Sequence, residues 1–92
     1  MKIRILYKCF PDALKGSVRG FTSTRGKSYI IMIDSDLGDP ERKKTLKHEL
    51  SHILLGHFED QDRSADELER EAIDHAEAMT DDELDQLLRY AV

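Results

Sequence analysis

The segment from Pro40 to His57 constrains the fold most, because it combines a helical apolar pattern with two histidines at helical spacing. His48 and His52 are four residues apart and fall on the side of a helix opposite its apolar residues. An aspartate followed by a proline, Asp39-Pro40, predicts the start of this helix. The apolar positions are Leu46, Leu50, Ile53 and Leu54. One side of the helix should therefore pack into a core while the other carries polar chemistry.

His48, Glu49 and His52 form the pattern H-E-x-x-H. Residues four apart share a helix face, so the two imidazoles can bind one tetrahedral Zn²⁺, with Glu49 beside them as a general base toward water. The alternative is that both histidines are only solvated residues on the polar side of an amphipathic helix. The pattern favours a zinc-dependent hydrolase with catalytic Glu49 and metal ligands His48 and His52.

A catalytic zinc needs a third protein ligand, and the helix expected over residues 65–79 carries several carboxylates. Glu71 is the first choice because it lies at one margin of the apolar face of that helix. Glu69, at the opposite margin, is the alternative ligand. Asp74 and His75 lie about one helical turn after Glu71. They are candidates for orienting a metal ligand by contacting it, without binding the metal themselves. An ordinary solvated glutamate is the competing interpretation of Glu71.

His57 is a rival ligand, because some zinc hydrolases extend the motif with a glycine and a third histidine. In that extended pattern these residues follow the second histidine by three and six positions. Here Gly56 and His57 follow His52 by four and five. His57 also falls on the apolar side of the helical wheel, so helix-end capping or a partly buried histidine is the favoured interpretation.

Three strands are expected before this helix and two helices after it. The strands are 2–8, the weaker 17–23 and the strongly β-prone 28–34, with a hairpin turn at Arg25-Gly26-Lys27. Capping boxes beginning at Ser64 and Thr80 predict helices over 65–79 and 81–91. The predicted fold is α+β, in a single domain over 1–92: a small antiparallel sheet of about three strands in 1–36, the metal-binding helix over 40–57, and two further helices.

A strand beside the metal helix can bind an extended peptide by edge pairing, and the strand 28–34 is the candidate. Tyr29, Ile31 and Ile33 are therefore candidate substrate-binding residues. An equally supported alternative is that this segment is only a core strand of the sheet.

The net charge of −5 is unevenly divided, with 11 Lys and Arg against 6 Asp and Glu in residues 1–58, and 3 against 13 in residues 59–92. The cations are mostly scattered and lack interleaved aromatics, so direct nucleic-acid binding is not expected. Cys9 is the only cysteine, which fits a reducing compartment. No apolar run reaches membrane-spanning length, and the first residues do not resemble a signal peptide. We expect a cytoplasmic protein without membrane contact.

Several blocks of the sequence resemble the ImmA/IrrE family of zinc metallopeptidases, of the gluzincin type. They are VRGF at 18–21, the strand at 29–34, TLKHELSHILLGH at 45–57 and EREA at 69–72. The resemblance implies a sheet before the H-E-x-x-H helix and a glutamate followed by alanine as the third zinc ligand, which corresponds to Glu71-Ala72. Members often lie beside phage-type repressors and cleave them, so the resemblance implies a helix-turn-helix repressor as protein substrate, in a phage or mobile-element setting.

One departure from the family pattern is the segment 78–82, AMTDD, where a Leu-Leu-Met-Pro-like segment is usual. The chain therefore looks like a minimal member. The competing function is a catalytically silent, zinc-stabilised interaction module that binds a regulator. Glu49 argues against it, because a structural zinc site has no use for a base beside an open position. A third alternative is a metal-dependent hydrolase of small molecules.

Overall fold

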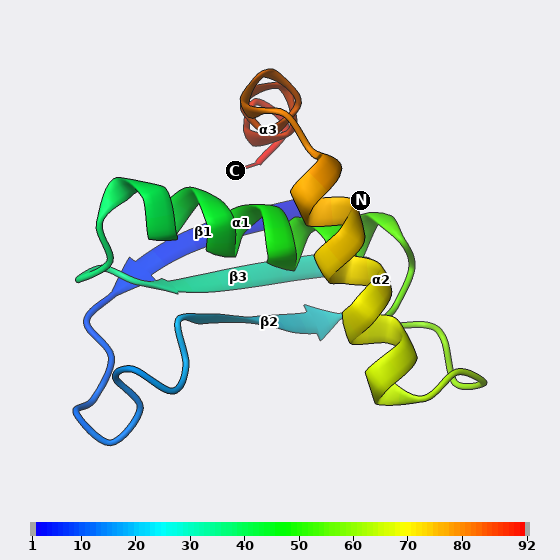
Figure 1. Cartoon of the computed structure of the whole chain (residues 1–92), viewed down its shortest axis with the longest axis horizontal. Coiled ribbons are helices and arrows are strands. Elements are labelled where there is room, and N and C mark those ends of the chain that lie inside the picture. The colour runs from blue at the N-terminus through cyan, green and yellow to red at the C-terminus, as the bar shows by residue number, and fades with distance from the viewer. Residues whose placement is uncertain (1, 92) are drawn as a thin grey trace.

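The computed structural model describes residues 2–91 and contains three strands followed by three helices (Figure 1). The α+β class and the numbers of strands and helices agree with the prediction. In Figure 1, α1 lies across one face of the sheet and α2 crosses beside it. The elements are β1 (Lys2–Lys8), β2 (Gly20–Arg25), β3 (Ser28–Asp34), α1 (Asp39–Leu54), α2 (Ala65–Ala78) and α3 (Asp81–Leu88).

The sheet has the order β1-β3-β2, so β3 is its central strand. β3 pairs in parallel with β1 and antiparallel with β2. The sheet is therefore mixed, and the prediction of an antiparallel sheet was wrong for β1. Parallel neighbours need a long connection, which residues 9–27 provide. The hairpin between β2 and β3 was predicted correctly, and Gly26 makes its tight turn with a φ of 62°.

β2 begins at Gly20, later than the predicted Ser17, because residues 12–17 form turns. Gly20 lies in close contact with α1 and with the neighbouring strand β3. A side-chain carbon built on Gly20 would lie 2.8 Å from both the Met32 carbonyl oxygen and the Thr45 methyl group. Glycine is therefore required there for α1 to pack against the strands.

α1 differs from its prediction at both ends. Its N-cap is Gly38, and no side chain caps it, whereas Asp39 was expected in that place. It ends at Leu54 instead of His57, because Gly56 adopts a left-handed φ of 69° and turns the chain back. The backbone N–H of His57 then donates to the carbonyl of His52, at 3.0 Å. This turn determines where the His57 side chain lies.

The caps of the two later helices were predicted correctly. The Ser64 hydroxyl accepts a hydrogen bond from the Glu67 N–H at 3.2 Å, and the Thr80 hydroxyl accepts one from the Glu83 N–H at 3.1 Å. Each bond satisfies an otherwise unpaired donor of the first helical turn. α3 is shorter than predicted and ends at Leu88.

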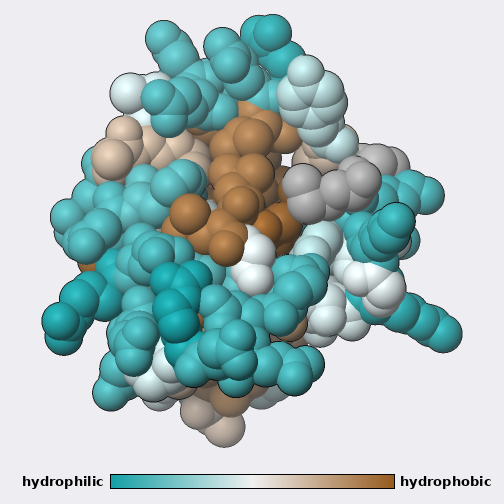
Figure 2. All heavy atoms as spheres, turned by 90° about the vertical axis from the view of Figure 1, so that its right-hand side faces the viewer, coloured by the Kyte–Doolittle hydropathy of each residue, from teal (hydrophilic) through white to brown (hydrophobic). Residues whose placement is uncertain are grey.

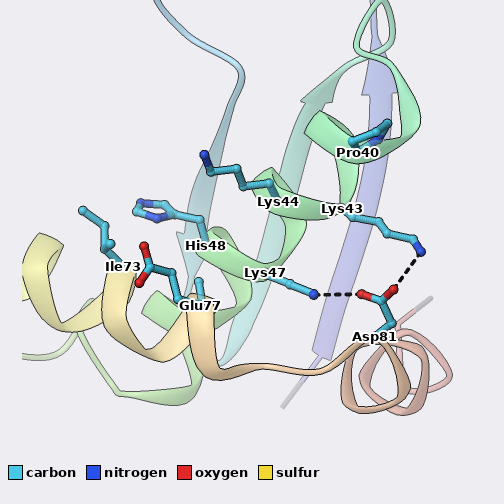
Figure 3. Close-up of a pocket in the computed structure, with 9 residues that line it drawn as sticks. Pro40, Lys43, Lys44, Lys47, His48, Ile73, Glu77 and Asp81 are labelled. Atoms are coloured by element: carbon cyan, nitrogen blue, oxygen red, sulfur yellow. Dashed lines mark hydrogen bonds and ion pairs between the residues drawn. The ribbon is translucent and has the colours of Figure 1, made fainter.

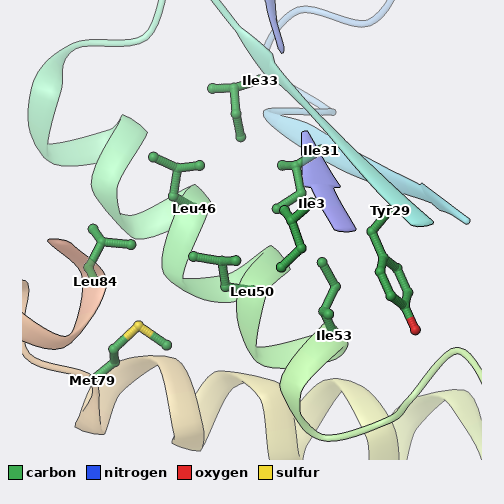
Figure 4. Packing of buried hydrophobic residues seen from close by; sticks show 9 residues of the cluster. All are labelled: Ile3, Tyr29, Ile31, Ile33, Leu46, Leu50, Ile53, Met79 and Leu84. Atoms are coloured by element: carbon green, nitrogen blue, oxygen red, sulfur yellow. The ribbon is translucent and has the colours of Figure 1, made fainter. Parts of the chain in front are cut away.

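The core lies between α1 and the sheet and extends to α2 and α3 (Figure 4). Leu46, Leu50 and Ile53 of α1 are buried as predicted, but Leu54 is 40 % exposed. Leu54 lines a surface hollow formed by the C-terminal ends of α1 and α2 and by α3, and Figure 2 shows an apolar strip on the side of the molecule where α1 ends. The buried cluster consists of Ile3, Tyr29, Ile31, Ile33, Leu46, Leu50, Ile53, Met79 and Leu84. Among the described residues, no helix is long and apolar enough to span a membrane.

Candidate metal centre

α1 brings His48, Glu49 and His52 together as predicted. The Nε2 atoms of His48 and His52 are 3.2 Å apart. A ligand atom of each of the three residues lies within 4.8 Å of the others. The grouping follows directly from the four-residue spacing on one helix, which is why sequence alone could predict it.

Glu69 of α2 completes this group. Its Oε1 lies 2.9 Å from Nε2 of His52, and its Oε2 lies 3.2 Å from Nε2 of His48. Sequence reasoning preferred Glu71 as the third ligand and kept Glu69 as the alternative. In the structure Glu69 is the carboxylate that contacts both histidines, whereas Glu71 contacts His57 and Arg63.

Ala72 explains why Glu69 and not Glu71 reaches the histidines. Ala72 is the buried residue of α2, and α2 packs against α1. Glu69 precedes Ala72 by three residues and shares its face, whereas Glu71 precedes it by one and is turned away by about 100°. Leu68, one turn before Ala72, is only partly buried.

The donor atoms fit the ion that the sequence predicts. Atoms bound tetrahedrally to Zn²⁺ at about 2.0–2.1 Å are separated from one another by roughly 3.3 Å. The Nε2 atoms of His48 and His52 are 3.2 Å apart, and each lies near a different oxygen of Glu69, His48 at 3.2 Å from Oε2 and His52 at 2.9 Å from Oε1. Two imidazoles and one carboxylate are also a common ligand set of catalytic zinc.

The electrostatics of His52 suit a metal ligand. Burial is the main cause that lowers the pKa of His52 below its ordinary value of 6.5, and the nearby Glu69 carboxylate opposes this shift. A lowered pKa favours the neutral imidazole, which is the form that keeps a free lone pair for a metal.

Glu49 is buried at the boundary between α1 and the sheet. The hydroxyl of Thr22 on β2 donates a hydrogen bond to Oε1 of Glu49 at 2.8 Å. The orientation of the carboxylate is therefore set by the strand. Thr22 was not predicted, since nothing in the sequence relates this position of β2 to α1.

His57 and Glu71 form a separate set of contacts on the Nδ1 side of the His52 ring. Nδ1 of His57 lies 2.9 Å from Nδ1 of His52, and Nε2 of His57 lies 2.7 Å from Oε1 of Glu71. Arg63 donates from Nη1 to Oε2 of Glu71 at 2.7 Å. The hydrogen bonds from Arg63, and next from His57, lower the pKa of Glu71 to about 2. The interpretation of His57 as a buried histidine agrees with its burial. The contact of Arg63 with Glu71 was not predicted.

Asp74 and His75 do not contact the three candidate ligands. Asp74 is exposed and lies with Glu71 and Arg70 on another side of α2. Nδ1 of His75 lies 2.8 Å from the hydroxyl of Ser51, which is fully buried in α1. His75 thus fastens α2 to α1 next to His52 and does not touch a ligand itself.

The predicted substrate-binding residues are core residues. Ile31 and Ile33 are fully buried and Tyr29 nearly so. Their strand, β3, is paired on both sides, so it has no free edge for a peptide. A peptide therefore cannot pair with an edge of this strand as was expected, and its buried residues agree with the alternative of a core strand. The strand at the sheet edge nearest to Glu49 is β2.

Two surface hollows meet at His48. One lies between α1 and α2 and includes Lys44, Ile73 and Glu77 (Figure 3). At its far end, Asp81 forms ion pairs of 3.2 and 2.8 Å with Lys43 and Lys47. The second hollow is lined by His48, Glu49 and Glu69 from the site and by Lys44, Thr45 and residues 16–20 around it. His48, Glu49 and Glu69 are therefore reached from the surface through the second hollow, which His52 does not line.

Comparison with known protein families identifies a match over nearly the whole chain. A model of a peptidase family described as the IrrE N-terminal-like domain matches residues 1–91. Searches of curated proteins and of solved structures found no match.

Proposed function

Because the chain belongs to the IrrE N-terminal-like domain family of peptidases, we propose that it is a zinc metallopeptidase that hydrolyses peptide bonds. The family membership confirms the resemblance seen in the sequence. The observation that carries the proposal is the convergence of His48, His52 and Glu69 beside the buried carboxylate of Glu49. A purely structural zinc site would not need a base held next to it.

His48, His52 and Glu69 would hold the ion. Bound Zn²⁺ would lower the pKa of a water molecule toward neutrality and polarise the carbonyl of the substrate. Glu49 takes a proton from the attacking water and later delivers it to the leaving amine. The Thr22 hydroxyl keeps one Glu49 oxygen fixed, which orients the carboxylate for this transfer. No covalent bond between enzyme and substrate is required.

The substrate is proposed to bind in extended form along β2. This strand lies at the edge of the sheet, and Thr22 links it directly to Glu49. An extended peptide can pair with such an edge through backbone hydrogen bonds. On the family resemblance alone, we propose a helix-turn-helix repressor as the substrate protein.

Glu49→Gln tests the proposed function. The substitution keeps the size of the side chain but removes the base, so peptide hydrolysis should fall by about 10²–10⁴-fold while zinc content stays unchanged. Asp85→Asn is a matched control, because it also replaces one carboxylate but lies exposed on α3. Cleavage would be followed by mass spectrometry on a peptide library and on a repressor. Full biological effect in Glu49→Gln would instead favour the silent interaction module.

A further inference from the structure

We propose that His57 and Glu71 act as a positioning pair, which holds His52 in the one tautomer that can bind metal. Arg63 fixes the pair in place. None of these three residues is assigned a contact with metal or substrate. The inference rests on the proposed function in one respect, namely that His52 is a ligand through its Nε2.

His57 contacts His52 through both its backbone and its side chain. Its N–H donates to the His52 carbonyl at 3.0 Å, and the Nδ1 atoms of the two rings are 2.9 Å apart. Only 3 % of the His57 side chain is exposed. A buried imidazole must have its nitrogens paired, and here the two partners are His52 and Glu71.

The contact between His57 and Glu71 determines which ring nitrogens of His57 and His52 carry a proton. Two neutral rings that meet Nδ1 to Nδ1 share one proton. If His57 carried it, the His57 Nε2 would have no proton and would face the Glu71 carboxylate at 2.7 Å, an unfavourable contact between two acceptors. The pair avoids this when His57 is protonated on Nε2 and His52 on Nδ1. The Nε2 of His52 then has a free lone pair toward Glu69 and the metal position.

Arg63 gives Glu71 a fixed orientation. It donates from Nη1 to Oε2 at 2.7 Å and from Nη2 to Oε1 at 3.3 Å. Arg63 is itself held by Asp60, through a bond of 2.7 Å from Nε. Asp60 and Arg63 thus anchor the outer end of the chain of contacts that runs to His52, and they orient Oε1 of Glu71 toward His57.

Such partners of a ligating histidine set its tautomer and raise its basicity, and losing them typically weakens metal binding by about 10–100-fold. The first experiment measures zinc affinity by competition with a chelator. His57→Phe and Glu71→Ala should each bind zinc about 10–100-fold more weakly. The double variant should be no weaker than His57→Phe, because Glu71 acts through His57.

Matched variants separate positioning from general damage. Asp74→Ala removes a carboxylate from the same side of α2, three residues from Glu71, and should leave zinc affinity within about twofold. His57→Gln should restore most of the affinity that His57→Phe loses, since an amide can accept from His52 and donate to Glu71. Equal loss in the Gln and Phe variants would contradict the proposal.

The second experiment reads the tautomers directly in the metal-free full chain. Long-range ¹H–¹⁵N correlation should show His52 protonated on Nδ1 and His57 on Nε2, with the His52 preference reduced in Glu71→Ala. This readout does not require peptidase activity or a folded His57→Phe variant. A wild-type His52 protonated on Nε2 would overturn the inference, and so would unchanged zinc affinity in both single variants. Loss of cleavage alone, with these results intact, would count only against the proposed function.

Discussion

Thr22 on the edge strand donates a hydrogen bond of 2.8 Å to Glu49 on α1. The sheet edge and the proposed general base are therefore coupled through one hydroxyl. A hydrogen bond to a charged group contributes roughly 1.5–3 kcal/mol, which is enough to influence the position of the carboxylate.

Thr22→Val should therefore lower kcat for peptide hydrolysis by about tenfold or more, with little change in zinc content. Valine keeps the shape of threonine and removes only the hydroxyl. Thr22→Ser, which retains the hydroxyl, is the control and should stay close to wild type. Steady-state kinetics on a cleavable peptide would measure both, and a Val variant as fast as wild type would exclude a role for this bond.

Glu69→Ala should weaken zinc binding more than Glu71→Ala does. Glu69 lies 2.9 and 3.2 Å from the two Nε2 atoms, whereas Glu71 reaches the site only through His57. Losing a ligand should exceed the roughly 10–100-fold cost of losing an outer partner. Metal analysis after dialysis against a graded chelator gives the comparison. The reverse order would restore Glu71 as the third ligand.

Leu50 and Leu54 lie four residues apart on α1 but differ in environment, with exposed fractions of 1 % and 40 %. Leu50→Ala should lower the free energy of unfolding by about 2–5 kcal/mol, because it removes fully packed atoms from the core. Leu54→Ala should cost less than about 1 kcal/mol. Urea denaturation with excess chelator would measure both without a contribution from bound metal. Similar losses for the two variants would contradict the packing of α1.

Asp60 should make stability depend on pH in the acid range. The side-chain hydrogen bond from Arg63, followed by backbone N–H groups, lowers the pKa of Asp60 from 3.8 to about 2. Its stabilising contribution is therefore present above about pH 4 and is lost as the pH falls toward 2. Asp60→Asn should be less stable than wild type at pH 6, and the difference should shrink at pH 2. Chemical denaturation of the metal-free proteins at both pH values tests this, and a constant difference would refute it.

The parts of the site that sequence could predict are those set by one helix. His48, Glu49 and His52 meet because of their spacing within α1, whatever surrounds them. The choice between Glu69 and Glu71 instead depends on which face of α2 packs against α1, and that is decided by tertiary contact at Ala72. Apolar periodicity in a helix rich in alanine and glutamate locates this face only to within about one residue.

The remaining errors have similar physical causes. β-propensity predicted the three strands but not the direction in which β1 pairs with β3, and the long connection between these two strands permits their parallel pairing. The helix was predicted to continue to His57, but Gly56 ends the regular geometry before that point. Capping signals at Ser64 and Thr80 were reliable because they depend on residues three positions apart.

The left-handed turn at Gly56 restricts how many residues can separate His52 from His57. It returns His57 beneath His52, so the number of residues between these histidines is as restricted as the number within H-E-x-x-H. One residue inserted after Leu55 would leave the helix and the sheet intact and yet separate the two rings. The functional unit of α1 therefore runs from His48 to His57, ten consecutive positions in which neither a deletion nor an insertion would be neutral.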